Sequence, residues 1–307
     1  MKVPAVLFFV TALAAAGPVP PNDFPAPKPV TTPGGSTDYW PAFSRDGKDI
    51  IFSRRSKETA WQLMTVPADG GNTRPLFDPK PSAVATRVSR SAGGRLAFAG
   101  ANTLWITDAE GRNPKRLDLK GVDGTASYPS WYPDEEHLLI VAYQKESGGV
   151  LYRVDIGSGK ATALTNPEEI HCGMPNVSPD GKLVIFAGQK NDGQVYDQKK
   201  NLIWIIAGDS PAKPLTPHQG RAATWSPDGR RIAYESTAGS PGGRLHALFL
   251  IDPDGRENRR ITSYQWDANH PVWSPDGKSL AFSIKDSDNP QRSRIATLPV
   301  PVVSDSL

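Results

Sequence analysis

The amino-acid sequence predicts an all-β fold, a six-bladed β-propeller whose blades are four-stranded antiparallel sheets. A short motif occurs six times, beginning at residues 43, 88, 131, 177, 225 and 273, so that one repeat takes 43 to 48 residues. Each copy is followed by short segments rich in β-branched and aromatic residues, which are typical of buried strands. No stretch has the sustained periodicity of an amphipathic helix. A fixed period of this length is that of one propeller blade.

The motif is an apolar residue followed by Ser-x-Asp-Gly, and its chemistry is that of a tight turn. Full copies begin at Phe43, Val177, Trp225 and Trp273, and degenerate copies begin at Val88 and Trp131. Proline, which fills the variable position in three of the four full copies, presets the backbone for a turn, aspartate bonds to its own backbone, and glycine accepts a positive φ. The motif therefore predicts a hairpin between the first two strands of each repeat.

Two further strands are expected in each repeat. A third strand recurs, as in residues 202–205, and a turn containing Gly or Asp follows it. A short outer strand then ends the repeat, as in residues 259–262. Each repeat thus holds four strands.

The last repeat lacks an outer strand before the sequence ends. An open edge would leave backbone groups unpaired, so another segment should cover it. Residues 28–31, Lys-Pro-Val-Thr, match the outer strand Lys-Pro-Leu-Thr at 213–216. We expect residues 28–32 to complete the last blade and close the ring. The alternative is a free N-terminal segment, with Val302 and Val303 turning back onto the blade.

The first residues predict export. Lys2, an apolar run from Val3 to Val10 and three alanines at 14–16 are typical of a secretory signal peptide at 1–16 that is cleaved after Ala16. The alternative, an anchor helix, needs about 20 apolar residues, and this run is shorter. We therefore divide the chain into a signal peptide (1–16), a Pro-rich linker (17–27), the propeller (28–300) and a C-terminal tail (301–307). The expected location is periplasmic or secreted, with no transmembrane segment after the signal is removed.

The composition of the chain limits which classes of partner are expected. The chain has 307 residues, a net charge of +3 and one cysteine, Cys172, so an intramolecular disulfide is impossible. Basic residues are scattered among the acidic ones rather than forming a stripe, which argues against a nucleic-acid partner. We expect a monomer.

The repeated apolar-Ser-Pro-Asp-Gly pattern, the aromatic residue in the following strand and the later Leu-Thr outer strand resemble the WD-like repeat of the TolB-like propeller family. The resemblance covers residues 28–300. It implies a propeller fold and a partner-binding mouth, although similar propellers occur in periplasmic scaffolds, in peptidases and in oligogalacturonate lyases. TolB itself also has an α/β domain before the propeller, whereas here 11 residues, Gly17 to Pro27, separate the predicted signal peptide from the first strand.

Catalytic motifs are missing from the sequence. It has no Gly-x-Ser-x-Gly turn, which argues against a serine hydrolase. Gly157-Ser158-Gly159-Lys160 lacks the full phosphate-loop pattern, and we interpret it as a hairpin turn. We therefore expect neither an enzyme nor a bound cofactor.

Candidate binding residues stand where the inner strands begin, because the loops there gather around the mouth of the central channel. Trp40, Tyr128, Met174 and His270 occupy equivalent positions in the repeat, with Asp267 close by in sequence. The residues expected to line the mouth are Asp38, Tyr39, Trp40, Tyr128, His171, His218, Arg221, Asn269 and His270.

These residues are compatible with three functions. The leading hypothesis is an envelope or extracellular module that binds another protein or a peptide through its aromatic mouth. In the second, His171, His218 and His270 hold a metal in a polysaccharide lyase or hydrolase, and Arg221 neutralises an acidic substrate. In the third, Trp40 and Tyr128 stack on a glycan or another small ligand that the protein binds without converting it.

Overall fold

The computed structural model describes residues 24–300, except residues 33, 58, 78–86, 101–102, 145–147, 288 and 290. The predicted signal peptide (1–16), the linker as far as residue 23 and the tail (301–307) lie outside the described residues. Within the described part of the chain, no helix combines the length and the hydropathy that crossing a membrane requires.

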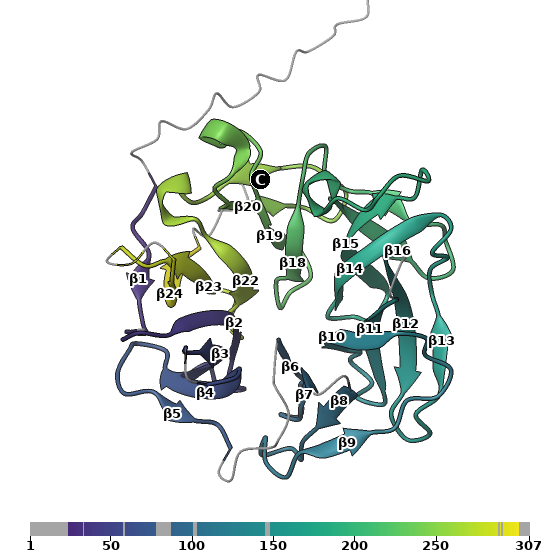
Figure 1. Ribbon diagram of the computed structural model, residues 1–307, viewed down its shortest axis with the longest axis horizontal. Coiled ribbons are helices and arrows are strands. Elements are labelled where there is room, and N and C mark those ends of the chain that lie inside the picture. The colour runs from purple at the N-terminus through teal and green to yellow at the C-terminus, as the bar shows by residue number, and fades with distance from the viewer. Residues whose placement is uncertain are drawn as a thin grey trace, which may run out of the picture.

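Antiparallel strands form sheets that stand around a central opening (Figure 1). In the residues described, the helical segments are three short 3-10 turns: η1 (Gln198–Lys200), η2 (Pro241–Gly243) and η3 (Tyr264–Trp266). The predicted all-β propeller fold with four-stranded antiparallel sheets is confirmed.

Every repeat contributes an inner, a second, a third and an outer strand, counted from the central opening outward. The inner strands are β2 (Thr37–Phe43), β6 (Val88–Arg90), β10 (Thr125–Trp131), β14 (Ile170–Val177), β18 (Arg221–Trp225) and β22 (Asn269–Trp273). The second strands are β3 (Asp49–Arg55), β7 (Leu96–Gly100), β11 (His137–Tyr143), β15 (Leu183–Lys190), β19 (Ile232–Ser236) and β23 (Ser279–Lys285).

The third and outer strands complete the four strands of each repeat. The third strands are β4 (Gln62–Pro67), β8 (Thr103–Ile106), β12 (Gly149–Asp155), β16 (Leu202–Ala207), β20 (Ala247–Ile251) and β24 (Ser293–Pro299). The outer strands are β5 (Arg74–Pro75), β9 (Lys115–Leu117), β13 (Ala161–Ala163), β17 (Lys213–Pro214), β21 (Arg259–Arg260) and β1 (Lys28–Pro29).

These strands form four separate four-stranded sheets, where the sequence predicted six. The strands β10 to β17 form a single eight-stranded sheet instead, because β12 pairs with β14 at one position, Gly149 opposite Cys172. The close approach depends on Gly149, since a Cβ atom there would overlap the carbonyl oxygen of Cys172. On either side of this bridge, β10–β13 and β14–β17 keep the strand order of the separate sheets.

The repeated motif forms the hairpin turns that the sequence predicted. In the turn after β14, the Ser178 hydroxyl donates to Asp180 at 2.6 Å and accepts the backbone N–H of Leu183 at 2.9 Å. Gly181 follows with a φ of 76°, a conformation that glycine adopts without steric strain. The bond from Ser178 lowers the pKa of Asp180, so the carboxylate stays charged and holds the turn.

The hydrophobic core lies between neighbouring sheets. A large side chain in the second strand of each repeat is fully buried there: Phe52, Phe98, Ile140, Phe186, Tyr234 and Phe282. These six positions follow the repeat, so each sheet presents a similar apolar face to the next.

The N-terminal segment completes the last sheet, as the sequence predicted. Strand β1 pairs antiparallel with β24, Lys28 opposite Thr297 and Pro29 opposite Ala296. Beyond β1, the backbone N–H of Val30 donates to the carbonyl of Ile295 at 2.9 Å, and the Thr31 hydroxyl accepts the N–H of Ile295 at 2.9 Å.

The outer segment of another repeat makes the same bonds. Leu215 donates its backbone N–H to Ile203, and the Thr216 hydroxyl accepts the N–H of Ile203. Residues 28–31 are therefore equivalent to residues 213–216, and the two ends of the described chain are joined by backbone hydrogen bonds.

Candidate functional site

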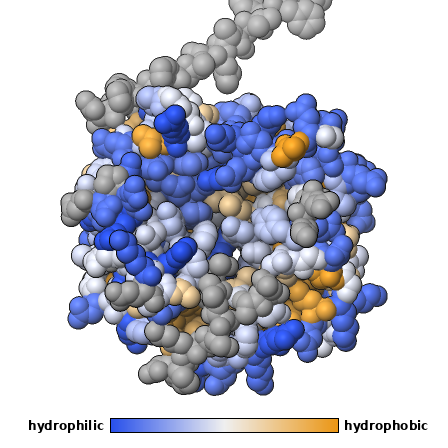
Figure 2. Space-filling view, viewed as in Figure 1, coloured by the Kyte–Doolittle hydropathy of each residue, from blue (hydrophilic) through white to orange (hydrophobic). Residues whose placement is uncertain are grey.

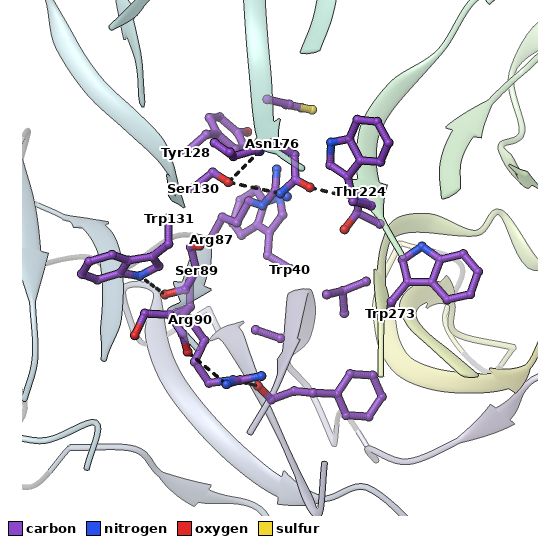
Figure 3. Close-up of a pocket in the computed structure, with 18 of the residues that line it drawn as sticks. Trp40, Arg87, Ser89, Arg90, Tyr128, Ser130, Trp131, Asn176, Thr224 and Trp273 are labelled. Atoms are coloured by element: carbon purple, nitrogen blue, oxygen red, sulfur yellow. Dashed lines mark hydrogen bonds between the residues drawn. The ribbon is translucent and has the colours of Figure 1, made fainter. Parts of the chain in front are cut away.

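The inner strands surround a pocket of about 330 Å³, and every inner strand contributes to its lining. In the space-filling view the surface is hollowed near its centre, where the inner strands of Figure 1 meet (Figure 2). Figure 3 shows the residues that line the pocket. We call this pocket the channel.

A bulge turns one side chain of five inner strands toward the channel. The pairing between inner and second strand shifts register there, for example between Tyr39 and Ala42. The residue at each shift has a positive φ: Trp40 (52°), Tyr128 (48°), Met174 (49°), Ala222 (48°) and His270 (55°). All five line the channel, and a left-handed backbone is uncommon for such residues. The corresponding position of the second repeat, residue 85, lies outside the described residues. We call these five positions the bulge ring.

A second ring lies two residues further along the inner strands. It consists of Ala42, Arg87, Ser130, Asn176, Thr224 and Val272, and all of them line the channel. Ser130 and Asn176 connect neighbouring repeats, because the Ser130 hydroxyl accepts the N–H of Val177 at 3.1 Å and Asn176 Oδ1 accepts the N–H of Trp225 at 3.1 Å.

Arg87 is the charged member of this second ring. Its guanidinium lies over the Tyr128 ring, 6.0 Å from the centroid. Burial lowers the pKa of Arg87. It makes no ion pair and no hydrogen bond with any residue that the structure describes. Sequence reasoning missed this residue, because it compared the repeats at the bulge ring and not two positions later, where the other repeats have uncharged side chains.

Aromatic rings form one wall at the channel mouth. Trp40 contacts Tyr39, Trp61 and His270, with ring centroids 5.7, 5.1 and 5.5 Å away. Tyr39 also meets His270 edge-on at 5.5 Å. Three of the predicted site residues, Tyr39, Trp40 and His270, are therefore in contact; Trp40 and His270 line the channel together with Tyr128, whereas Tyr39 packs behind them outside its lining.

A buried carboxylate holds His270 in place. Glu235 is fully buried and accepts the backbone N–H of His270 at 2.6 Å. The other carboxylate oxygen forms an ion pair with Arg221 at 2.8 Å, and Arg221 also approaches His246 at 3.3 Å. Burial by itself would raise the pKa of Glu235, but the neighbouring His270, Arg221 and His246 hold it below its ordinary value.

The imidazole of His270 is neutral at pH 7. Burial lowers the pKa of His270 to about 4, an effect that the nearby Glu235 only partly offsets. Its Nδ1 is buried without a hydrogen-bond partner among the described residues, so no hydrogen bond from that atom stabilises an added proton.

This pKa predicts loss of stability in mild acid. Between about pH 6.5 and 4 the unfolded chain binds a proton at His270 and the folded chain does not, so lowering the pH favours unfolding. We expect the free energy of unfolding to fall by on the order of 2 kcal/mol over this interval because of His270. Urea unfolding of the wild type and of His270→Asn at several pH values measures it. An equal acid loss in His270→Asn would contradict the assignment.

Several predicted site residues have structural partners instead. Asp38 is fully buried and pairs with Arg54 through two contacts of 2.7 and 2.8 Å. Arg221 is neutralised by Glu235, so it is not a free cation for an acidic ligand. Asn269 donates to the carbonyl of Asp267 at 2.6 Å. That these side chains bind a ligand at the mouth stays a prediction.

The three histidines of the metal hypothesis are not brought together. His171 accepts the N–H of Gly148 at 3.0 Å and packs against Tyr196, whereas the ring of His218 packs against Phe249. Only His270 lines the channel. In the part of the chain that the structure describes, no group of three or more His, Cys, Asp or Glu side chains could hold a metal ion.

Known proteins share this architecture. Residues 67–275 match the family model described as the TolB beta propeller domain. A Tol-Pal system protein TolB from Francisella tularensis is 28% identical over 197 residues, which cover 60% of this chain and 40% of that protein. The matches span less than half the length of the curated relatives.

Solved structures agree on the fold. TolB from Acinetobacter baumannii superposes with a TM-score of 0.57 at 18% identity, over 87% of this chain and 64% of that one. An oligogalacturonate lyase in complex with manganese superposes with a TM-score of 0.59 at 16% identity, over 89% and 93% of the two chains. At such identities the likeness concerns the fold alone.

Proposed function

The chain belongs to the TolB beta propeller domain family, and on this basis we propose that it is an exported six-bladed propeller that binds another protein or a peptide in its channel without converting it. We count six blades by taking the eight-stranded sheet as two, since a single bridge joins its halves. We treat residues 28–300 as one domain.

The observation that carries this proposal is the bulge ring. Five inner strands adopt the same uncommon backbone, and four of the side chains that they turn toward the channel are large: Trp40, Tyr128, Met174 and His270. Strained backbone of this kind is concentrated at functional sites, and aromatic anchors supply most of the energy at protein interfaces. We assign the binding surface to Tyr39, Trp40, Tyr128 and His270 of the predicted residues, and we add Arg87.

We place the protein in the periplasm or outside the cell, with an envelope protein as its partner. The predicted signal peptide supports export. The relative from Francisella tularensis is named as a Tol-Pal system protein, which favours a role among envelope proteins.

The proposal is tested by crosslinking and affinity capture from the exported fraction. The full chain should recover a defined protein, and Trp40→Ala and Tyr128→Ala should each weaken its binding at least about tenfold, as expected for buried aromatic anchors. Val195→Ser is the matched control, because Val195 is 90% exposed and lies outside the channel lining.

Thermal unfolding of each variant verifies that it is folded. Equal recovery of the protein by the wild type and both channel variants would refute binding at the channel. Binding of a neutral glycan, abolished by the same two substitutions, would assign the channel to a carbohydrate instead.

A further inference from the structure

Arg87 occupies a position where the repeat does not require a charge. The equivalent residues in the other inner strands are uncharged, and Ser130 and Asn176 among them hold the next repeat by hydrogen bonds. Arg87 makes no such bond with a described residue. The architecture of the ring therefore does not explain this arginine.

The other two arginines near the channel have direct polar partners. Arg221 pairs with Glu235 at 2.8 Å. Arg90, which also lines the channel, donates to the carbonyls of Phe43 at 3.0 Å and Ser91 at 3.1 Å. Arg87 lies against the face of Tyr128, which attracts a cation, and the carboxylate that acts on it through space, Glu235, is already paired with Arg221. A partly buried cation without a direct ion pair is unfavourable, and an anionic group of a ligand would offset that penalty.

We propose that the channel binds a carboxylate on Arg87, and that this carboxylate belongs to an Asp or Glu side chain of the protein partner. This inference rests on the proposed function and specifies the chemistry of its ligand. A guanidinium matches a carboxylate with two parallel N–H···O bonds. A phosphate normally collects several cations, whereas the other arginine in the lining, Arg90, already donates to backbone carbonyls.

The packing of the aromatic side chains favours an acidic peptide over an acidic sugar. A sugar ring needs a free aromatic face, but Trp40 is surrounded by Tyr39, Trp61 and His270 at interplanar angles of 45°, 50° and 60°. Tyr128 has Arg87 over its ring and Tyr143 against it at 76°. A narrow acidic side chain can reach Arg87 between these rings without stacking on them.

The test compares three probes on the full chain by calorimetry at fixed ionic strength. The probes are a blocked pentapeptide with one central Glu among glycines, the same peptide with Gln, and galacturonate. The Glu peptide should bind the wild type at least about tenfold more tightly than the Gln peptide does, and Arg87→Gln should abolish that difference. Arg116→Gln is the matched control, because it removes one positive charge at an exposed site, where Arg116 pairs with Asp118.

The melting temperature of Arg87→Gln distinguishes a binding role of Arg87 from a structural one. Since Arg87 makes no ion pair and no hydrogen bond with a described residue, Arg87→Gln should melt at the same temperature as the wild type or higher, whereas loss of a structural arginine would lower the melting temperature. The Glu peptide should raise the melting temperature of the wild type and of Arg116→Gln but not of Arg87→Gln.

Three results would overturn the inference: equal binding of the Glu and Gln peptides, a clear fall in the melting temperature of Arg87→Gln, or binding of galacturonate without the Glu peptide. None of them concerns partner capture. If Arg87→Gln keeps the captured partner while Trp40→Ala loses it, the proposed function stands and the carboxylate site does not.

Discussion

Deleting residues up to 32 is expected to lower the free energy of unfolding by about 5 kcal/mol. The deletion removes β1, the buried side chain of Val30, and the hydrogen bonds that Val30 and Thr31 make to Ile295. A buried valine contributes about 1.5 to 3 kcal/mol, and each hydrogen bond about 1 kcal/mol. The exposed edge of β24 should also promote aggregation, because its backbone groups lose their partners. Urea unfolding and light scattering measure both effects.

Two point variants keep this prediction testable if the shortened chain does not fold. Thr31→Val keeps the shape of the side chain but removes the acceptor for the N–H of Ile295, so it should cost about 1 to 2 kcal/mol. Lys28→Ala changes an exposed side chain of the same strand and should be neutral within about 0.5 kcal/mol. An unchanged urea midpoint for the deletion would mean that the N-terminal strand does not close the ring.

Gly149→Ala is expected to destabilise the protein by at least about 3 kcal/mol. The added methyl group would overlap the carbonyl oxygen of Cys172 and a methyl carbon of Val141, and the carbonyl belongs to backbone that cannot move aside cheaply. The bridge that merges two sheets should break, so hydrogen exchange should accelerate at the edges of β12 and β14.

Gly157→Ala provides the control for that substitution. A methyl group there would meet only Asp155, at 3.7 Å, and Gly157 does not have a positive φ. We expect a change within about 0.5 kcal/mol. If both alanine variants lose the same stability, the close approach at Gly149 is not what matters.

The fold was predictable because the sequence consists of repeats, each with the same turn motif. The spacing of the turn motif placed the strands, and the match of residues 28–31 to 213–216 identified the closing strand. The merged sheet was not predictable, because it depends on one close contact at Gly149 and not on any property of the repeat.

The candidate site was predicted in part. Trp40, Tyr128 and His270 were placed at the channel because they share a position in the repeat, and the bulge recurs there. The partners of Asp38 and Arg221 were not predictable, because they lie across the hairpin, where Asp38 is opposite Arg54 and Arg221 is opposite Glu235. The register of a bulged hairpin is not evident from one sequence, so the ion pairs that neutralise these residues could not be predicted.

The bulge ring also bears on how such a protein could change its ligand. Tryptophan, tyrosine, methionine, alanine and histidine adopt nearly the same left-handed backbone at these positions, so the conformation does not depend on side-chain chemistry. The surrounding sheet imposes this backbone conformation, and the chemistry of the side chain at each position can vary. Single substitutions at these positions can therefore change what the channel binds while the backbone stays the same.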